Sequence, residues 1–335
     1  DGIAPYTFLW SNGDNTDTAR NLVAGKYFVS ITDTKNCILV DSVTITEPST
    51  LNSVVGDSLD VSCFGFNDGW IASLASGGTP PYTYLWSDGQ ITDTAKNLTA
   101  GTYTVTISDN NGCTSVLTAL INEPTVLSNA MAAQSNVSCN GLSDAVAFAT
   151  PAGGTPPYTY LWSDAQSTDT ARNLAAGKYL LTVTDNQNCS LLDSITITEP
   201  LTLTSAVGDS LDASCFGFSD GWIAAIGNGG TLPYSYSWSN GQNSDTAKNL
   251  TAGNYTVTIS DNNGCTSVLT TSISQPVVLS NTVNTLSNVS CNGLSDAIAY
   301  ATPAGGTSPY TYLWSDAQNT DTARNLAAGK YFVTV

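Results

Sequence analysis

One segment of the sequence returns at a constant distance of 76 residues. It reads PYTYLWS from Pro81, and close variants of it begin at Pro5, Pro157, Pro233 and Pro309. Its tryptophans keep the same step without an insertion or deletion: Trp10, Trp86, Trp162, Trp238 and Trp314. A fixed period of this size is the signature of repeat architectures. The sequence therefore predicts a tandem array of one small module.

A Glu-Pro or Gln-Pro pair closes each repeat, at residues 47–48, 123–124, 199–200 and 275–276. With these pairs as boundaries, modules 1 to 5 run over 1–48, 49–124, 125–200, 201–276 and 277–335. Modules 1 and 5 are partial, so we expect the chain to be part of a longer protein. Modules 2 and 4 share one set of motifs and modules 3 and 5 another, which predicts a duplicated block of two modules.

The amino-acid composition argues against several classes of function. The formal net charge is −18, and the nine Lys and Arg form no basic stripe, which argues against a nucleic-acid partner. The chain has no histidine and shows no nucleophile with its base, so we expect no enzyme and no required cofactor. Two regularly spaced cysteines per module indicate an oxidising compartment. We therefore expect an extracellular region that is not inserted in a membrane.

The local pattern is that of short strands separated by turns. In module 2 it predicts strands over 50–63, 70–75, 82–86, 103–107 and 113–121 and a short segment near 93–98, with Gly-, Pro- and Asn-rich turns between them. No stretch has helical periodicity. This spacing is typical of a β-sandwich.

Two motifs resemble parts of immunoglobulin-like domains. Residues 98–103, LTAGTY, resemble the Leu…Gly…Tyr corner of fibronectin type III domains, and residues 84–89, YLWSDG, resemble the Trp-bearing third strand of PKD domains. The resemblance implies all-β modules of PKD-like or fibronectin III-like sandwich fold, arranged head to tail in a filament.

A compensating exchange of side chains between modules indicates which positions form the core. At the 76-residue step, Trp70 and Ala72 become Val146 and Phe148. Exchange of a large and a small side chain for two medium ones is expected of a packed interior, so we predict that Trp70 faces the core. The alternative is an exposed platform on which a sugar stacks.

The motifs of module 2 taken in order resemble a known repeat. They are CFGFNDG at 63–69, GGTPPYTYLWS at 77–87, NLTAGTYTVT at 97–106 and DNNGCT at 109–114. Together they resemble the SprB repeat of Bacteroidota surface adhesins, which include gliding-motility adhesins exported by type IX secretion. Modules 3 and 5 depart from the pattern, because Ala145 and Ala297 replace the glycine of position 69.

The resemblance implies the structural repeat region of a filamentous cell-surface adhesin, attached to the outer membrane in the full-length protein. Its partners would be neighbouring modules, an external surface or polysaccharide, and further copies that self-associate into a filament. The alternative function is a passive stalk that presents an enzyme or a carbohydrate-binding domain outside these residues. A third is a rod stiffened by calcium.

The cysteines form two series, one at the end of the first strand and one at the start of the last strand. Pairing within a module, such as Cys63 with Cys113, is the ordinary expectation for a secreted domain. In an immunoglobulin-like sandwich, however, these positions lie at opposite poles, roughly 20 Å apart. Bridged Cα atoms lie within about 7 Å. We therefore predict bridges between modules, Cys63–Cys189 and Cys139–Cys265, with Cys37, Cys215 and Cys291 bonded beyond residues 1–335.

Acidic turns offer candidate calcium ligands at the module junctions. They are Asp109 and Asn111, with Asp33, Asp185 and Asp261 at equivalent positions, facing Asn67 and Asp68 of a neighbour. The competing interpretation is local turn chemistry, for which Asp and Asn are the usual residues. The spacing of an EF-hand loop is absent.

Short Asp-Thr-Ala and Asp-Ser-aliphatic motifs match an O-glycosylation acceptor pattern of Bacteroidota. A repeated turn would explain them equally well. The candidate acceptors are Thr18, Thr94, Thr170, Thr246, Thr322, Ser42, Ser58, Ser194 and Ser210.

Alternate modules show a pair of outward apolar residues. Strand alternation places Leu161 and Leu180 of module 3 outward, with Leu9, Phe28, Leu313 and Phe332 at equivalent positions of modules 1 and 5. Such a pair predicts a lateral contact site, or a patch covered by the chain over 164–173.

Overall fold

The computed structural model describes residues 2–335, and its regular structure consists of β-strands. Residues 2–335 contain no helix that is long and apolar enough to span a membrane. The chain divides into two compact units. The first runs to Asn129 and includes Pro151–Thr159 and Val183–Leu191, and the second comprises Ala130–Thr150, Tyr160–Thr182 and Leu192–Val335.

The strands repeat with the modules. Module 1 has β1 (Thr7–Trp10), β2 (Gly25–Thr32) and β3 (Ile38–Ile45). Module 2 has β4 (Asn52–Leu59), β5 (Gly69–Ser76), β6 (Thr83–Trp86), β7 (Thr94–Leu98), β8 (Gly101–Ser108) and β9 (Thr114–Ile121). Module 3 has β10 (Ser128–Ser135), β11 (Ser143–Ala152), β12 (Thr159–Trp162), β13 (Thr170–Ala175), β14 (Gly177–Thr184) and β15 (Ser190–Ile197).

The last two modules follow the same order. Module 4 has β16 (Thr204–Leu211), β17 (Gly221–Asn228), β18 (Ser235–Trp238), β19 (Thr246–Leu250), β20 (Gly253–Ser260) and β21 (Thr266–Ile273). Module 5 has β22 (Ser280–Ser287), β23 (Ala297–Ala304), β24 (Leu313–Trp314), β25 (Thr322–Leu326) and β26 (Val333–Thr334).

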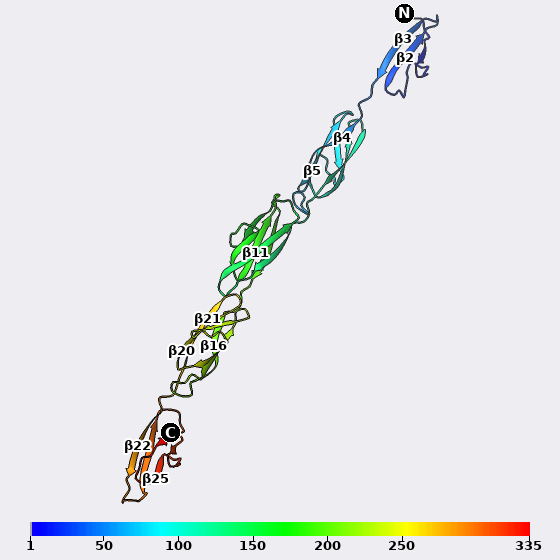
Figure 1. Ribbon diagram of the computed structural model, residues 1–335. Helices are drawn as coiled ribbons and strands as arrows, with labels where there is room; N and C mark the ends of the chain where they lie inside the picture. Colours follow the sequence, from blue (N-terminus) through cyan, green and yellow to red (C-terminus); the bar gives the residue numbers. More distant parts are fainter. Residues whose placement is uncertain (1) are drawn as a thin grey trace. The chain divides into compact units, whose positions relative to one another are not determined.

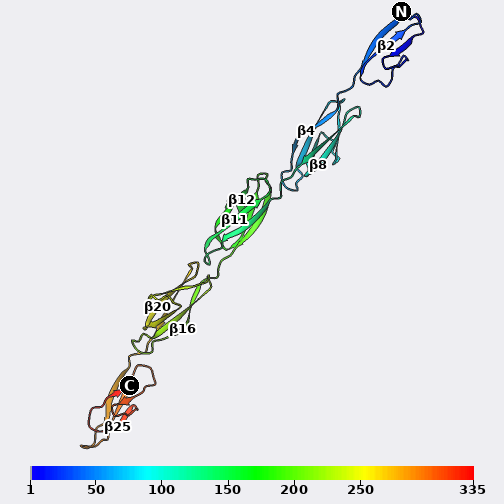
Figure 2. The same cartoon turned by 45° about the vertical axis from the view of Figure 1, so that its right-hand side comes forward.

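Module 2 serves as the example of a complete module, and its strands β4 and β5 are labelled in Figure 1. One antiparallel sheet has the order β4-β5-β7 and the other β6-β8-β9, and strands of both sheets are labelled in Figure 2. Modules 3 and 4 repeat these two three-stranded sheets. The modules are immunoglobulin-like β-sandwiches, as the sequence predicts.

The core of module 2 lies between its two sheets. Trp86 is 2% exposed and packs with Ile71, Leu98 and Ile121. Its indole N–H donates to the carbonyl oxygen of Thr92 at 2.8 Å, so the one polar atom of the ring is satisfied inside the core. The equivalent tryptophans of modules 3 to 5 each donate to a carbonyl oxygen at 2.9 Å.

The Leu…Gly…Tyr corner is present in the structure. The Tyr103 hydroxyl donates to the carbonyl oxygen of Thr99 at 3.1 Å, and Tyr255 makes the same bond to Thr251 at 2.9 Å. A tyrosine that bonds back to the chain a few residues upstream is typical of immunoglobulin-like sandwiches.

The prediction that Trp70 faces the core is wrong. Ile71 is fully buried, so its neighbour Trp70 lies on the opposite, outer face of β5, where it is half-buried. Its cross-strand partner is Leu59, which is 55% exposed. Trp70 and Ala72 of module 2, and their equivalents Val146 and Phe148 of module 3, therefore lie on the outer face of the sheet. The summed volume of the two side chains is conserved on this face, as it would be in an interior.

Candidate functional site: the disulfide junctions

The most distinctive sites of the chain are its links between successive modules. A disulfide joins Cys63 of module 2 to Cys189 of module 3, with a Cα–Cα distance of 5.7 Å. A second joins Cys139 of module 3 to Cys265 of module 4 at the same distance. These are the two pairs expected from the sequence, and pairing of Cys63 with Cys113 does not occur.

A tight loop after the first strand presents Cys63. The carboxylate of Asp68 accepts the backbone N–H of Ser62 at 3.0 Å, and the N–H of Phe66 donates to the carbonyl oxygen of Cys63 at 3.0 Å. The hydroxyl and then the backbone N–H of Ser62 hold the pKa of Asp68 below its usual value. Gly65 has φ of 75°, the left-handed conformation that glycine adopts without strain. These bonds fix the cysteine, which is 5% exposed.

A buried aspartate positions the partner, Cys189. The carboxylate of Asp185 accepts the backbone N–H groups of Thr155 at 2.8 Å, Gln187 at 2.9 Å and Cys189 at 2.9 Å. The Cys189 Sγ lies 3.4 Å from the carbonyl oxygen of Ser62. Hydrogen-bonded turns therefore hold the two cysteines on both sides of the bridge.

The glutamate of the boundary pair has a role that the sequence did not reveal. The Glu123 carboxylate accepts the N–H of Gly65 at 2.9 Å, which ties the cysteine loop to the end of the same module. Glu199 bonds Gly141 at 2.7 Å, and Gln275 bonds Gly217 at 2.8 Å through its amide oxygen. Because glutamine replaces glutamate here, the site requires an acceptor oxygen and no charge. The recurrence of Glu or Gln at one position was the available signal.

The second junction has further polar contacts between modules 3 and 4. The side-chain amide of Asn263 donates to the carbonyl oxygen of Ser138 at 2.9 Å. The Thr202 hydroxyl donates to the side-chain oxygen of Asn140 at 2.8 Å, and within module 3 the Asn140 amide donates to the carbonyl oxygen of Pro200 at 3.1 Å. Hydrogen bonds thus surround this disulfide.

The remaining cysteines, Cys37, Cys113, Cys215 and Cys291, are exposed and carry free thiols. Each observed bridge spans 126 residues. Cys37 and Cys113 are equivalent to Cys189, so a partner 126 residues earlier would precede residue 1. Cys215 and Cys291 are equivalent to Cys63, so a partner 126 residues later would follow residue 335.

The candidate calcium ligands are occupied by turn hydrogen bonds. Asp109 accepts the backbone N–H groups of Thr79, Asn111 and Cys113, each at 2.9 Å. These bonds, that of Thr79 first, hold the pKa of Asp109 below its usual value. No group of three or more His, Cys, Asp or Glu that could hold a metal ion occurs in the described part of the chain. The acidic turns therefore fit the turn interpretation.

The candidate glycan acceptors lie in two settings. Ser42, Ser58, Ser194, Ser210 and Thr18 are exposed. The other four threonines are half-buried at the start of the fourth strand of their modules, and each hydroxyl donates to the preceding aspartate at 3.0 Å: Thr94, Thr170, Thr246 and Thr322.

The two candidate lateral residues are on the surface. Leu161 is 58% exposed and Leu180 is 41% exposed, so the chain over 164–173 does not cover them. Leu192 on β15 is 64% exposed and was missed, although the alternation of that strand indicates it. In module 1, Phe28 pairs directly with the candidate acceptor Ser42, so a glycan there would lie beside the apolar residue.

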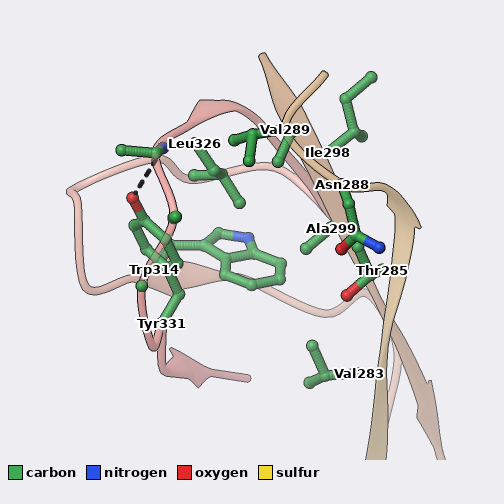
Figure 3. Close-up of a pocket in the computed structure, with 13 residues that line it drawn as sticks. Val283, Thr285, Asn288, Val289, Ile298, Ala299, Trp314, Leu326 and Tyr331 are labelled. Carbon is green, nitrogen blue, oxygen red and sulfur yellow. Dashed lines mark hydrogen bonds between the residues drawn. The ribbon is translucent and has the colours of Figure 1, made fainter. Parts of the chain in front are cut away.

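A cavity of about 390 Å³ opens in module 5 (Figure 3). Trp314, Leu326 and Ala297 are among the residues that line it. The Tyr331 hydroxyl accepts the Ala327 N–H at 3.1 Å, the dashed line of Figure 3.

The complete modules show what belongs in this cavity. Ile121, at the end of β9 in module 2, is 1% exposed and packs with Trp86 and Leu98. A Cβ added to Gly69 would lie 3.0 Å from its Cγ2 atom. Ala297, Trp314 and Leu326 correspond to Gly69, Trp86 and Leu98 of module 2, so the cavity lies at the position that Ile121 of the last strand fills there.

The sequence matches the model of the SprB repeat four times, at residues 56–91, 131–167, 208–243 and 283–319. Each match begins in the first strand of a module and ends after the tryptophan-bearing segment. No curated protein matches the chain.

Solved structures with some likeness are chains of several domains. The three N-terminal domains of the bacteriophage RB49 outer capsid protein Hoc are 14% identical, with 68% of this chain and 98% of that chain covered and a TM-score of 0.34. Sidekick-1 immunoglobulin domains 1–5 are 10% identical, with 81% and 75% covered and a TM-score of 0.31. The eight N-terminal Ig domains of the Down syndrome cell adhesion molecule are 11% identical, with 99% and 65% covered and a TM-score of 0.23.

Each of the four matches lies inside one of modules 2 to 5 and includes its first cysteine and the tryptophan of its core. Residues 56–319 therefore contain four SprB repeats in tandem, which indicate a repeat region of a cell-surface protein.

Proposed function

We propose that this chain is the structural, non-enzymatic repeat region of a filamentous bacterial surface adhesin that contacts an external surface or polysaccharide. Such an adhesin would serve surface attachment or gliding and would be exported by type IX secretion and held at the outer membrane. The observation that carries the proposal is the covalent joining of successive SprB modules, Cys63 to Cys189 and Cys139 to Cys265. Repeat proteins derive their stability from each module and its neighbour, so an array can vary in length without refolding.

The proposal assigns adhesion to the modules themselves. Purified chain should coat glass or a polysaccharide layer and compete with the binding of whole cells. If the modules do not adhere while other parts of the full-length protein do, the repeat region is a passive stalk. A quartz-crystal microbalance measures both outcomes.

Lateral association of arrays is a second part of the proposal. Leu161 and Leu180 form an exposed apolar pair on module 3, and a second copy of the chain is the occupant that we assign to it. Changing both residues to serine should lower the sedimentation coefficient of any assembly formed at high protein concentration. The matched change Leu85→Ser on module 2, where Thr104 stands in place of Leu180, should have less effect.

Glycosylation of the exposed Asp-Ser serines is the third part. Ser42 and Ser194 are accessible on the outer strands β3 and β15. A glycan would raise the hydration of these faces. Protein isolated from its native host should exceed the mass of the bare chain, and an intact mass equal to that of the bare chain would exclude the modification.

A further inference from the structure

The two disulfides are interleaved along the chain. The first spans Cys63 to Cys189, the second Cys139 to Cys265, and both spans contain residues 139–189. Module 3 takes part in both: its second cysteine bonds to the preceding module, and its first cysteine bonds to the following one. The bridges therefore connect modules by a route that differs from the backbone.

Two kinds of segment lie between the cysteines. Cys189 and Cys215 are joined by 26 residues of backbone, which contain β15, the linker and β16. Cys37 and Cys63 are joined by an equal length, which contains β3 and β4. The segment from Cys139 to Cys189, in contrast, contains β11 to β14 and the buried Trp162.

We propose that the inter-module disulfides form a short covalent path that limits the extension of the array under tension. From Cys63 to Cys215 the backbone path has 152 residues, whereas the path through Cys189 has 26 residues and one disulfide. At about 3.4 Å per residue, the two paths reach roughly 520 Å and roughly 95 Å when fully extended. The shorter path becomes taut first and carries the load.

The short path has little length in reserve. Of its 26 residues, eight lie in β15 and eight in β16. Strand residues already rise about 3.3 Å each, close to the limit of an extended chain. Unfolding of β11 to β14 adds nothing to this path, because those strands lie outside it. The body of module 3 can therefore unfold and refold without lengthening the array.

This inference goes beyond the proposed adhesive role and does not depend on it. It requires only the connectivity of Cys63 with Cys189, and it holds for any function in which the array is pulled from its ends. A protein that holds a cell against a moving surface would gain a nearly fixed length from it.

Single-molecule stretching tests the inference on the full chain. Handles are attached by thioether bonds to the free thiols of Cys37 and Cys215, with Cys113→Ser and Cys291→Ser to remove the other attachment points. In the oxidised protein the path between the handles has 52 residues and one disulfide, so the extension should end at roughly 180 Å. After reduction in place, the same molecule should reach roughly 600 Å, about a threefold gain.

Two matched variants locate the effect. Cys139→Ser with Cys265→Ser removes the bridge that is not on the short path, and its extension limit should equal that of the oxidised parent. Cys63→Ser with Cys189→Ser opens the short path, and its limit should rise to on the order of 500 Å. Because the limit is read at full extension, it does not depend on whether a variant keeps its native fold.

The inference is overturned if the oxidised parent stretches as far as the reduced one. It is equally overturned if the Cys139→Ser, Cys265→Ser variant gains the length that the Cys63→Ser, Cys189→Ser variant should gain.

Discussion

At the scale of single residues, burial separates side chains that look alike in the sequence. Trp86 and Trp70 both recur at the 152-residue step, and both stand in strands. Trp86 is enclosed between the sheets with its N–H bonded, whereas Trp70 lies half-buried on an outer face. Their energetic roles should therefore differ.

We expect Trp86→Ala to lower the free energy of unfolding of module 2 by about 3–5 kcal/mol, the cost of truncating a large buried aromatic side chain. Trp70→Ala should cost no more than about 2 kcal/mol, because its outer face already contacts water. Denaturant titration followed by circular dichroism compares the two variants. Equal losses would contradict the placement of Trp70.

Asp109 is the residue whose charge matters most for its turn. Its pKa is held below the usual value by the N–H of Thr79 and by those of the turn that ends at Cys113. A carboxylate with a depressed folded pKa stabilises the fold above its unfolded pKa of about 3.9, and this contribution is lost as the pH falls through the folded value.

We therefore expect Asp109→Asn to be less stable than the parent at pH 7, with the difference shrinking as the pH approaches 2. Thermal unfolding of both proteins across this range measures it. A difference that stays constant with pH would show that the charge of Asp109 does not act in this way.

At the scale of elements, the sequence predicts that the strands exist better than it predicts where they end and which face is buried. The strands of module 2 were located from turn residues and alternation, and the expected first strand over 50–63 is shorter, ending at Leu59. The face of β5 was misassigned because the exchange of Trp70 and Ala72 for Val146 and Phe148 shows that volume is conserved but not on which side. Period-two alternation fixes a face only when one buried neighbour, here Ile71, is known.

The disulfide junction between modules 2 and 3 was likewise predicted only in part. Spacing and fold sufficed to expect Cys63–Cys189, because the poles of one sandwich are too far apart for a bridge. The recurrence of Glu or Gln marks position 123 as special, but its partner Gly65 cannot be predicted, because the bond joins residues 58 positions apart through a loop whose shape the sequence does not state.

The cysteine loop should depend on an acceptor at position 123. We expect Glu123→Gln to leave stability unchanged within about 0.5 kcal/mol, since Gln275 accepts the same bond in module 4. Glu123→Ala should cost about 1 kcal/mol, because the N–H of Gly65 loses its partner. Denaturation of the two variants side by side tests this. A large loss for the glutamine variant would show that charge is needed after all.

At the scale of the whole molecule, the protein consists of repeated small modules that are joined by covalent bonds. Each complete module has one thin core between two three-stranded sheets, and each bridge ties a cysteine loop to a buried-aspartate turn of the next module. SprB repeats identify the region as part of a cell-surface protein. The disulfides distinguish an array of linked modules from a row of independent ones.

Peptide mapping of the oxidised chain without reduction tests this most directly. After alkylation of free thiols and proteolysis, mass spectrometry should find Cys63 linked to Cys189 and Cys139 linked to Cys265, with Cys37, Cys113, Cys215 and Cys291 alkylated. Peptides that link Cys63 to Cys113, or Cys139 to Cys189, would show bridges within modules and would contradict the account.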